Sequence, residues 1–338
     1  MILHAHSYNT IMTKILIFGA GGVGCIYALI LWRAGEEVTA VCRSNYEAIQ
    51  TNGITVRSKK WGTCSARPNA VRTTQEAAQL GPYEYIIVCS KAFPNTAKLI
   101  SAAVSPETVI VLAQNGIGIE AEYAVAYPHN TIVSGVVYLP TTQVEPGVIE
   151  HGTPLERFEI GTYPSTSHAD AKAKVDQLAE LFAKGDGTCI PYDDVQAQRW
   201  YKLALNAALN PVTALTLCDD ANFIRSSEGA LAMLKDIMRE VGVTARAYGY
   251  DNIDETSIAQ QMVRHEERLV TGGKEPSMLV DVRHERPVEV EAILGNAVRM
   301  AKAKKVGVPL LSMLYTLTKA RNFAISQDGA WKPIARVV

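Results

Sequence analysis

The sequence predicts an α/β domain of the doubly wound kind followed by an all-α domain. Short, continuously apolar runs, typical of buried parallel strands, alternate with helical patterns as far as residue 193. From Asp194 onward only long helical patterns remain. A length of 338 residues suits two domains, which we place at 1–193 and 194–338, with residues 1–13 as a flexible extension.

Composition and charge exclude several classes of protein. Apolar residues make up 48% of the chain and charged residues 20%, which is enough for folded cores. The 33 Lys and Arg nearly balance the 34 Asp and Glu, so the basic excess of a general nucleic-acid binder is missing. Because the sequence has no long uninterrupted apolar run, we expect no membrane-spanning helix.

Cysteine and histidine spacing gives two further expectations. The six cysteines are widely spread and form no CxxC motif, so we expect reduced thiols in a cytoplasmic protein. The seven histidines lack the spacing of paired metal ligands, so we expect no metal site.

The first element is a strand over Lys14–Phe18, followed by a glycine turn, a helix through Arg33 and a strand over Glu37–Cys42. The turn carries a GxGxxG motif of Gly19, Gly21 and Gly24, with Gly22 and Val23 where the helix begins. In such a motif the glycines permit the tight turn, the approach of a pyrophosphate and close helix–strand packing. The motif therefore predicts a Rossmann-type dinucleotide site; the alternative is a glycine-rich turn that binds nothing.

The end of the second strand predicts which dinucleotide is bound. An NAD site has a carboxylate there for the ribose 2′-hydroxyl, but this chain has Arg43 and Ser44. Because a guanidinium pairs with phosphate, we expect NADP(H), with Arg43 on the 2′-phosphate. The alternative is a solvent-exposed arginine without this role.

The remaining elements of the first domain follow the same pattern. The predicted strands are Ile54–Ser58, Thr63–Ala66, Tyr85–Cys89, Thr108–Leu112, Ile132–Leu139, Gly147–His151, Arg157–Gly161 and Thr188–Pro191, the later ones partly antiparallel. Helices are predicted over Asn95–Ala103 and Ala169–Lys184. In the second domain the predicted helices are Asp194–Leu209, Asn222–Tyr248, Glu255–Thr271, Pro287–Lys304 and Pro309–Asn322. A cleft between the two domains is where we expect ligands.

Two polar residues follow strands at the edge of the sheet that binds ligands. Lys91 comes just after the predicted strand Tyr85–Cys89 and could meet a phosphate or a carboxylate, or it could be an ordinary loop lysine. Asn115 follows Thr108–Leu112 and could bind the nicotinamide side of the cofactor or the substrate. The Asn115-Gly116 pair could also be only a turn.

A polar stripe on an otherwise apolar helix is the most informative feature of the second domain. Lys202, Asn206 and Asn210 are spaced four residues apart among Leu and Ala, and Pro211 is expected to end or kink the helix. Burying these groups without partners is unfavourable, so something polar must face them. Since burial lowers the pKa of a lysine, Lys202 suits the proton donor that hydride reduction of a ketone requires. An ordinary solvent-facing stripe is the alternative.

A later segment supplies more polar groups. Glu289 is predicted in the first turn of the helix that begins at Pro287, where the helix dipole favours a carboxylate even without a function. Alternatively, Glu289 binds a substrate hydroxyl and Ser277 a substrate carboxylate.

From Lys14 to about Ala320 the sequence resembles the ketopantoate reductase (2-dehydropantoate 2-reductase) family. The resemblance rests on GAGGVG, SKA at Lys91, QNGIG at Asn115, WYKLALNAALNPVTAL at Lys202 and SMLVDVRHERPVEVEAILG at Glu289. It implies NADPH-dependent reduction of 2-dehydropantoate to pantoate, a step toward pantothenate and coenzyme A.

The resemblance also implies roles for individual residues. Lys202 matches the catalytic lysine and Glu289 the substrate-binding glutamate. The matching NADP-binding residues are Gly19, Gly21, Gly24, Arg43 and Lys91, and the matching cofactor and substrate contacts are Asn115, Asn206, Asn210 and Ser277. The family fold, a Rossmann domain followed by a helical domain, agrees with the boundary drawn from the patterns.

Two departures from the family pattern leave alternatives open. Asp220 stands where an asparagine is expected, and Leu294 where the family often has Asn before Gly. An extra carboxylate near an anionic substrate is unfavourable, so the substrate could be another 2-oxo acid, or the loop could be shifted. A nonenzymatic NADP-binding sensor and a homodimer also remain open.

Overall fold

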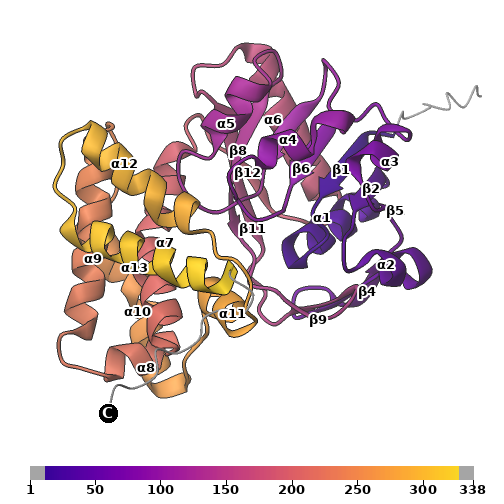
Figure 1. Ribbon diagram of the computed structural model, residues 1–338. Coiled ribbons are helices and arrows are strands. Elements are labelled where there is room, and N and C mark those ends of the chain that lie inside the picture. The colour runs from indigo at the N-terminus through magenta and orange to yellow at the C-terminus, as the bar shows by residue number, and fades with distance from the viewer. Residues whose placement is uncertain (1–11, 327–338) are drawn as a thin grey trace, which may run out of the picture. The chain divides into compact units, whose positions relative to one another are not determined.

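The computed structural model describes residues 12–326, which form two compact units (Figure 1). Unit 1 contains the residues up to 90 together with 95–114 and 122–193. Unit 2 contains residues 91–94, 115–121 and those from 194 on. The extension predicted over residues 1–13 lies outside the described residues as far as residue 11.

Unit 1 is built on an eight-stranded sheet in the order β12-β11-β8-β7-β6-β1-β2-β5. The strands are β1 (Lys14–Phe18), β2 (Glu37–Val41), β5 (Asn69–Val71), β6 (Tyr85–Val88), β7 (Val109–Leu112), β8 (Ile132–Tyr138), β11 (Arg157–Tyr163) and β12 (Cys189–Pro191). Six neighbouring strands of this sheet run parallel to one another: β8, β7, β6, β1, β2 and β5. The strand β11 runs antiparallel to β8. The sheet order reverses at β1, so β1 and β6 end at a topological switch point.

The helices of unit 1 are α1 (Gly22–Arg33), α2 (Tyr46–Asn52), α3 (Thr74–Ala78), α4 (Thr96–Leu99), α6 (Ala169–Lys184) and α5 (Glu120–Ala126), whose first two residues belong to unit 2, with a 3₁₀ turn at Ser101–Ala103. The unit's core lies between α1, α6 and the sheet. There the Tyr27 ring is 5.0 Å from that of Phe158 and 5.1 Å from that of Phe182. This packing holds α1, and with it the glycine turn, against the sheet.

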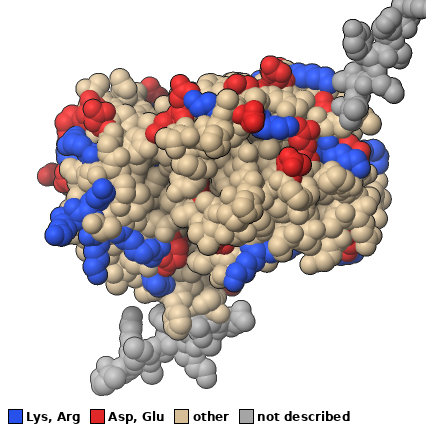
Figure 2. Space-filling model, turned by 90° about the horizontal axis from the view of Figure 1, so that it is seen from above, with Lys and Arg blue, Asp and Glu red and all other residues tan. Residues whose placement is uncertain are grey.

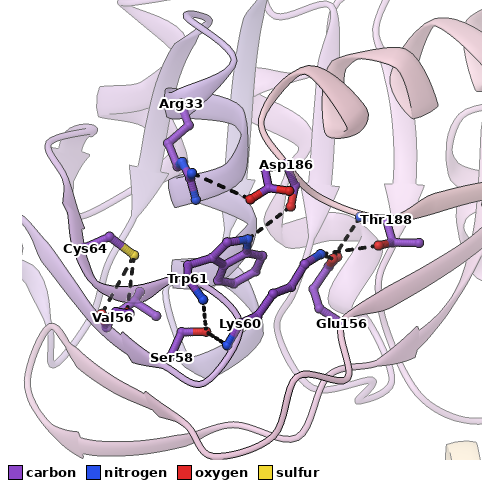
Figure 3. A network of polar contacts seen from close by, with 10 residues as sticks. Arg33, Val56, Ser58, Lys60, Trp61, Cys64, Glu156, Asp186 and Thr188 are labelled. Carbon is purple, nitrogen blue, oxygen red and sulfur yellow. Dashed lines mark hydrogen bonds and ion pairs between the residues drawn. The ribbon is translucent and has the colours of Figure 1, made fainter.

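A second sheet of four strands, in the order β4-β3-β10-β9, belongs to the same unit. Its strands are β3 (Ile54–Ser58), β4 (Gly62–Ala66), β9 (Thr142–Glu145) and β10 (Val148–His151). Figure 3 shows how the β3–β4 turn is fastened: Lys60 Nζ lies 2.8 Å from the buried Glu156 carboxylate, and Trp61 Nε1 donates to the Asp186 carbonyl at 3.1 Å. These contacts tie the small sheet to the segments that flank β11 and β12.

Unit 2 is helical, with no strand among its described residues. Its elements are α7 (Gln196–Thr216), α8 (Asp220–Arg225), α9 (Ala230–Arg246), α10 (Glu255–Thr271), α11 (Ser277–Arg283), a π-helical segment at Glu291–Gly295, α12 (Asn296–Ala303) and α13 (Pro309–Ser326). The helix α7 packs against α9, α11 and α13 around buried residues such as Trp200, Met238 and Leu294 (Figure 1). The predicted fold class, a Rossmann-type α/β domain followed by a helical domain, is confirmed.

Four helix predictions were wrong in their ends or in their continuity. The helix through Lys202 continues past Pro211 to Thr216, because Pro211 and its neighbours are buried and packing outweighs one lost hydrogen bond. The helix predicted over Asn222–Tyr248 breaks between α8 and α9, at Ser226, Ser227 and Gly229, which are weak helix formers.

The third error lies near Glu289. The helix predicted from Pro287 begins only at about Val290, so Glu289 precedes it. The Arg286 N–H donates to the Asp281 carbonyl at 2.9 Å, and the Val288 N–H donates to Asn322 Oδ1 at 2.9 Å. These contacts hold the segment in a non-helical conformation. The helix predicted over Asn95–Ala103 is likewise divided, into α4 and the 3₁₀ turn.

The surface carries charges of both signs. Figure 2 shows acidic and basic side chains interspersed between large uncharged areas on the face in view. Within residues 12–326, no helix is both long and apolar enough to cross a membrane. The same residues contain no group of three His, Cys, Asp or Glu side chains arranged to hold a metal ion.

Candidate functional site

The glycine turn after β1 has two glycines that packing requires and one that it does not. Gly19 has φ +103°, and a Cβ there would lie 2.7 Å from the Ser90 nitrogen at the end of β6. A Cβ on Gly24 would lie 2.1 Å from the Gly19 carbonyl oxygen. A Cβ on Gly21 would meet no atom of residues 12–326 within 4 Å, so packing within this part of the chain does not explain that glycine. Open space at this position fits the close approach of a pyrophosphate.

The N-terminus of α1 offers its amides at the same place. Gly22 and Val23 begin this helix of 12 residues, no side chain caps it, and its first turn has no acidic residue. Nearby, the Ser90 Oγ is buried and lacks a hydrogen-bond partner among residues 12–326. A helix N-terminus with these properties favours an anion, so the turn fits the phosphates of a dinucleotide.

The segment after β2 is tied to the glycine turn. Asn45 is buried, and its Nδ2 donates to the Ala20 carbonyl at 2.6 Å and to Gln143 Oε1 at 2.9 Å. Arg43 and Ser44, which directly precede Asn45, are exposed. The anchored Asn45 therefore fixes the backbone from which the Arg43 guanidinium extends into solvent.

Unit 2 brings Lys91, Asn115, Lys202 and Glu289 together. The Lys202 Nζ donates to Asn115 Oδ1 at 2.9 Å. Glu289, which is 8% exposed, accepts the Ala92 N–H at 2.9 Å. Burial raises the pKa of Glu289, whereas the Ala92 N–H, the charges of Lys91 and Lys202 and a hydrogen bond from Asn115 oppose that rise. An ammonium group and a buried carboxyl group thus share one amide, Asn115.

Asp281 holds Lys91 from the other side. Its carboxylate, whose side chain is 6% exposed, pairs with Lys91 Nζ and accepts from Arg286 Nε at 3.1 Å. Burial lowers the pKa of Lys91, and Arg286 adds to that effect while Glu289 opposes it. The short loop at Lys91 and Ala92 is therefore held by two carboxyl groups, those of Asp281 and Glu289.

A buried ion pair positions the Asn115 loop. Arg199 lies one turn before Lys202 on α7, and its Nε is 2.9 Å from Glu120 Oε1 with both side chains buried. The Arg199 Nη1 also donates to the Gly116 carbonyl at 2.8 Å. The residue next to Asn115 is thus attached to the helix that carries Lys202.

The π-helical segment holds the same loop from a second direction. The Ile117 N–H donates to the Ala292 carbonyl at 3.0 Å. Gly116 has φ +102°, and a Cβ there would lie 2.4 Å from the Ala292 oxygen. Only glycine allows this approach, so the QNG sequence is more than a turn signal.

Asn206, Asn210 and Ser277 lie on α7 and α11, two helices that pack against each other. Asn206 and Asn210 follow Lys202 at intervals of four residues on α7, and Asn210 is buried. Ser277 is the first residue of α11.

Both departures from the family pattern have structural partners. The buried Asp220 carboxylate pairs with Arg268, is 2.7 Å from His265 Nδ1, and accepts the Lys274 N–H at 2.6 Å. It is therefore neutralised within the protein and does not present a bare charge. Leu294 is fully buried in the core of unit 2.

Sequence reasoning missed four residues that support the site: Glu120, Arg199, Asp281 and Arg286. Arg199 had a signal, because it is a charged residue at the start of an otherwise apolar helix. Asp281 and Arg286 lie within the SMLVDVRHER sequence, but nothing in their spacing indicates that Asp281 pairs with Lys91, which is 190 residues away.

Comparisons with known proteins give a consistent family. Residues 15–165 match the family model described as ketopantoate reductase PanE/ApbA, and residues 194–322 match the model of its C-terminal part. An uncharacterised protein of Saccharomyces cerevisiae is 30% identical over 90% of this chain and 92% of its own length. A 2-dehydropantoate 2-reductase of Nostoc is 26% identical over 89% of this chain and 93% of its own. The crystal structure of 2-dehydropantoate 2-reductase from Methylococcus capsulatus superposes with a TM-score of 0.79 and 32% identity, over 93% of this chain and 98% of that one.

Proposed function

Since the chain belongs to the ketopantoate reductase PanE/ApbA family, whose members are NAD(P)-dependent 2-oxo acid reductases, we propose that it reduces 2-dehydropantoate to pantoate with NADPH. The product would serve pantothenate and coenzyme A synthesis. The observation that supports this most is the 2.9 Å contact between Lys202 Nζ and Asn115 Oδ1 beside the buried Glu289. A held ammonium group next to a buried acid suits a reaction that needs one proton at a carbonyl oxygen.

The glycine turn and its surroundings would bind the cofactor. Gly19 and Gly24 shape the turn, and Gly21, Gly22 and Val23 bring backbone amides to the phosphates. Arg43 would bind the 2′-phosphate, and Lys91 and Asn115 would bind further along the cofactor. When bound, NADPH supplies the hydride for the substrate carbonyl carbon.

Lys202 would donate its proton to the carbonyl oxygen as negative charge develops there. Asn115 orients the Lys202 ammonium through its Oδ1. Glu289, whose carboxyl group is fixed by the Ala92 N–H, would accept a hydrogen bond from a substrate hydroxyl group. Further substrate contacts would come from Ser277, Asn206 and Asn210. After the reaction Lys202, which is only partly buried, regains its proton from solvent.

A panel of 2-oxo acids tests the proposal through the loss of NADPH absorbance and the identification of the hydroxy acid formed. The panel should include 2-dehydropantoate, a short unbranched acid and an aromatic acid. We expect the highest kcat/KM with 2-dehydropantoate. Preference for another acid would correct the substrate, and tight NADPH binding with no turnover on any acid would instead indicate a nonenzymatic sensor.

A further inference from the structure

A second guanidinium lies at the same edge of the sheet as Arg43. The strands β2 and β5 are parallel neighbours with Val41 opposite Val71, and the Cys42 N–H donates to the Val71 carbonyl at 2.8 Å. Arg72 directly follows Val71, so it is level with Cys42 and one position before Arg43. The register therefore brings both arginines out at the carboxyl ends of adjacent strands.

The Arg72 side chain is held in place by its neighbours. Its guanidinium carbon lies 4.0 Å from the centre of the Tyr46 ring, and its Nη2 pairs with the Glu47 carboxylate. Its backbone N–H donates to Glu76 Oε2 at 2.8 Å. Tyr46 directly follows the anchored Asn45, so the ring that supports Arg72 is fixed to the loop that carries Arg43.

The carboxylate partner of Arg72 is one that a bound anion could displace. Its partner Glu47 is 76% exposed, and an exposed carboxylate pairs weakly with arginine. A phosphate carries more charge and accepts two parallel N–H bonds from the planar guanidinium. A phosphate placed between Arg43 and Arg72 would therefore replace Glu47 as the partner of Arg72.

From this arrangement we propose that Arg72 is a second determinant of cofactor specificity, which binds the 2′-phosphate of NADP(H) together with Arg43 while Tyr46 supports its guanidinium. Glu47 keeps Arg72 in position when no phosphate is bound and opposes the phosphate by its charge. The inference rests on the proposed use of NADP(H), and it concerns binding alone, so catalysis is not needed to test it.

Isothermal titration of the full-length protein with NADP⁺, NAD⁺ and the fragment 2′,5′-ADP is the direct test. We expect Arg72→Ala to weaken the binding of NADP⁺ and 2′,5′-ADP by about 10- to 100-fold, which corresponds to a lost hydrogen bond to a charged group. The affinity for NAD⁺ should stay within about two-fold of the wild-type value. Arg72→Lys keeps the positive charge but loses the two parallel N–H donors of the guanidinium. Its affinity for NADP⁺ should therefore lie between those of the wild type and Arg72→Ala. Glu47→Gln should strengthen the binding of NADP⁺, because it removes the negative charge that competes with the 2′-phosphate.

Arg57→Ala is the matched control. Arg57 belongs to the same unit, is ion-paired with Glu150, and its side chain is 52% exposed, as is that of Arg72. We expect it to leave all three affinities unchanged. Equal losses of NADP⁺ and NAD⁺ in Arg72→Ala, or no loss of either, would overturn the role of Arg72.

The same data separate this inference from the proposed function. If the wild type prefers NADP⁺ and only Arg43→Ala removes that preference, the inference about Arg72 fails and the proposed cofactor stands. If the wild type prefers NAD⁺, the proposed cofactor itself is wrong, and the inference falls with it.

Discussion

In the proposed reaction Lys202 is the proton donor, and its contact with Asn115 leads to a specific prediction. Lys202→Ala removes the proton donor, so we expect kcat to fall by about 10²–10⁴ with NADP⁺ affinity unchanged. Lys202→Arg retains the charge, but a guanidinium does not release its proton near neutral pH, so this variant should be nearly as inactive. Steady-state kinetics and calorimetry measure the two effects. An active Lys202→Arg would show that charge alone suffices.

Asp281 contacts Lys91 and Arg286, so in the proposed mechanism it positions Lys91, whereas Lys202 acts on the substrate. Asp281→Asn leaves two cations without their shared carboxylate, so the hold on Lys91 is lost. If Lys91 binds the cofactor as proposed, KM for NADPH should rise roughly ten-fold with a much smaller change in kcat. In a Lys91→Met background the same substitution should add little, since coupled residues are not additive. A full additional loss there would show that Asp281 acts by another route.

At the residue scale, sequence patterns predicted side chains with local signals and missed those with distant partners. The stripe through Lys202 was visible because a cation interrupts an apolar helix, and the structure supplies Asn115 as its polar partner. The pairing of Asp281 with Lys91 joins residues 190 positions apart, and it depends on folding that no local pattern records. The same holds for Arg199 and Glu120, 79 positions apart by residue number.

At the scale of elements, the glycine turn gives a contrast between two single substitutions. A Cβ on Gly21 meets no atom within 4 Å among the residues that the structure describes, so we expect Gly21→Ala to fold normally. Its methyl group should weaken cofactor binding, because it fills the space at the pyrophosphate. Gly24→Ala places its Cβ 2.1 Å from a backbone oxygen, so it should lower the melting temperature. Thermal unfolding with and without NADP⁺ separates the two. A Gly21→Ala variant that binds normally would remove Gly21 from the site.

Elements with strong periodicity were predicted well, and short or interrupted ones were not. The strand Lys14–Phe18 and the helices Ala169–Lys184 and Glu255–Thr271 match their predicted bounds. The strand Asn69–Val71 and the helix Tyr46–Asn52 are too short to carry a period, yet Arg72 directly follows that strand and Tyr46 begins that helix. The π-helical segment at Glu291–Gly295 likewise has no sequence signature, because it forms where the Ala292 carbonyl meets the Asn115 loop.

At the scale of the whole molecule, the change from alternating strands to helices at Asp194 was readable because hydrophobic period depends only on the sequence. The assignment of residues 91–94 and 115–121 to the helical unit was not readable. Both are loops that follow strands of unit 1, and their contacts with distant residues such as Asp281, Glu289 and Arg199 assign them to unit 2.

The free energy of unfolding should depend on pH through the carboxyl group of Asp220. Burial would raise the pKa of its carboxyl group, but hydrogen bonds from His265, the Lys274 backbone and Arg268 outweigh burial and hold the pKa well below its usual range. Because the folded pKa is depressed, the stabilisation is fully present above the unfolded pKa of about 4 and is lost as pH falls below it.

Asp220→Asn should therefore destabilise the protein by about 1–3 kcal/mol at pH 7, measured by urea unfolding, and the difference from wild type should shrink as pH falls below about 4. The control is Asp236→Asn, which removes an exposed partner of Arg239 and should change stability by less than about 1 kcal/mol. If Asp220→Asn is as stable as wild type at pH 7, the carboxylate is not a structural charge. It would then be free to face the substrate, and the preference for 2-dehydropantoate would have to be reconsidered.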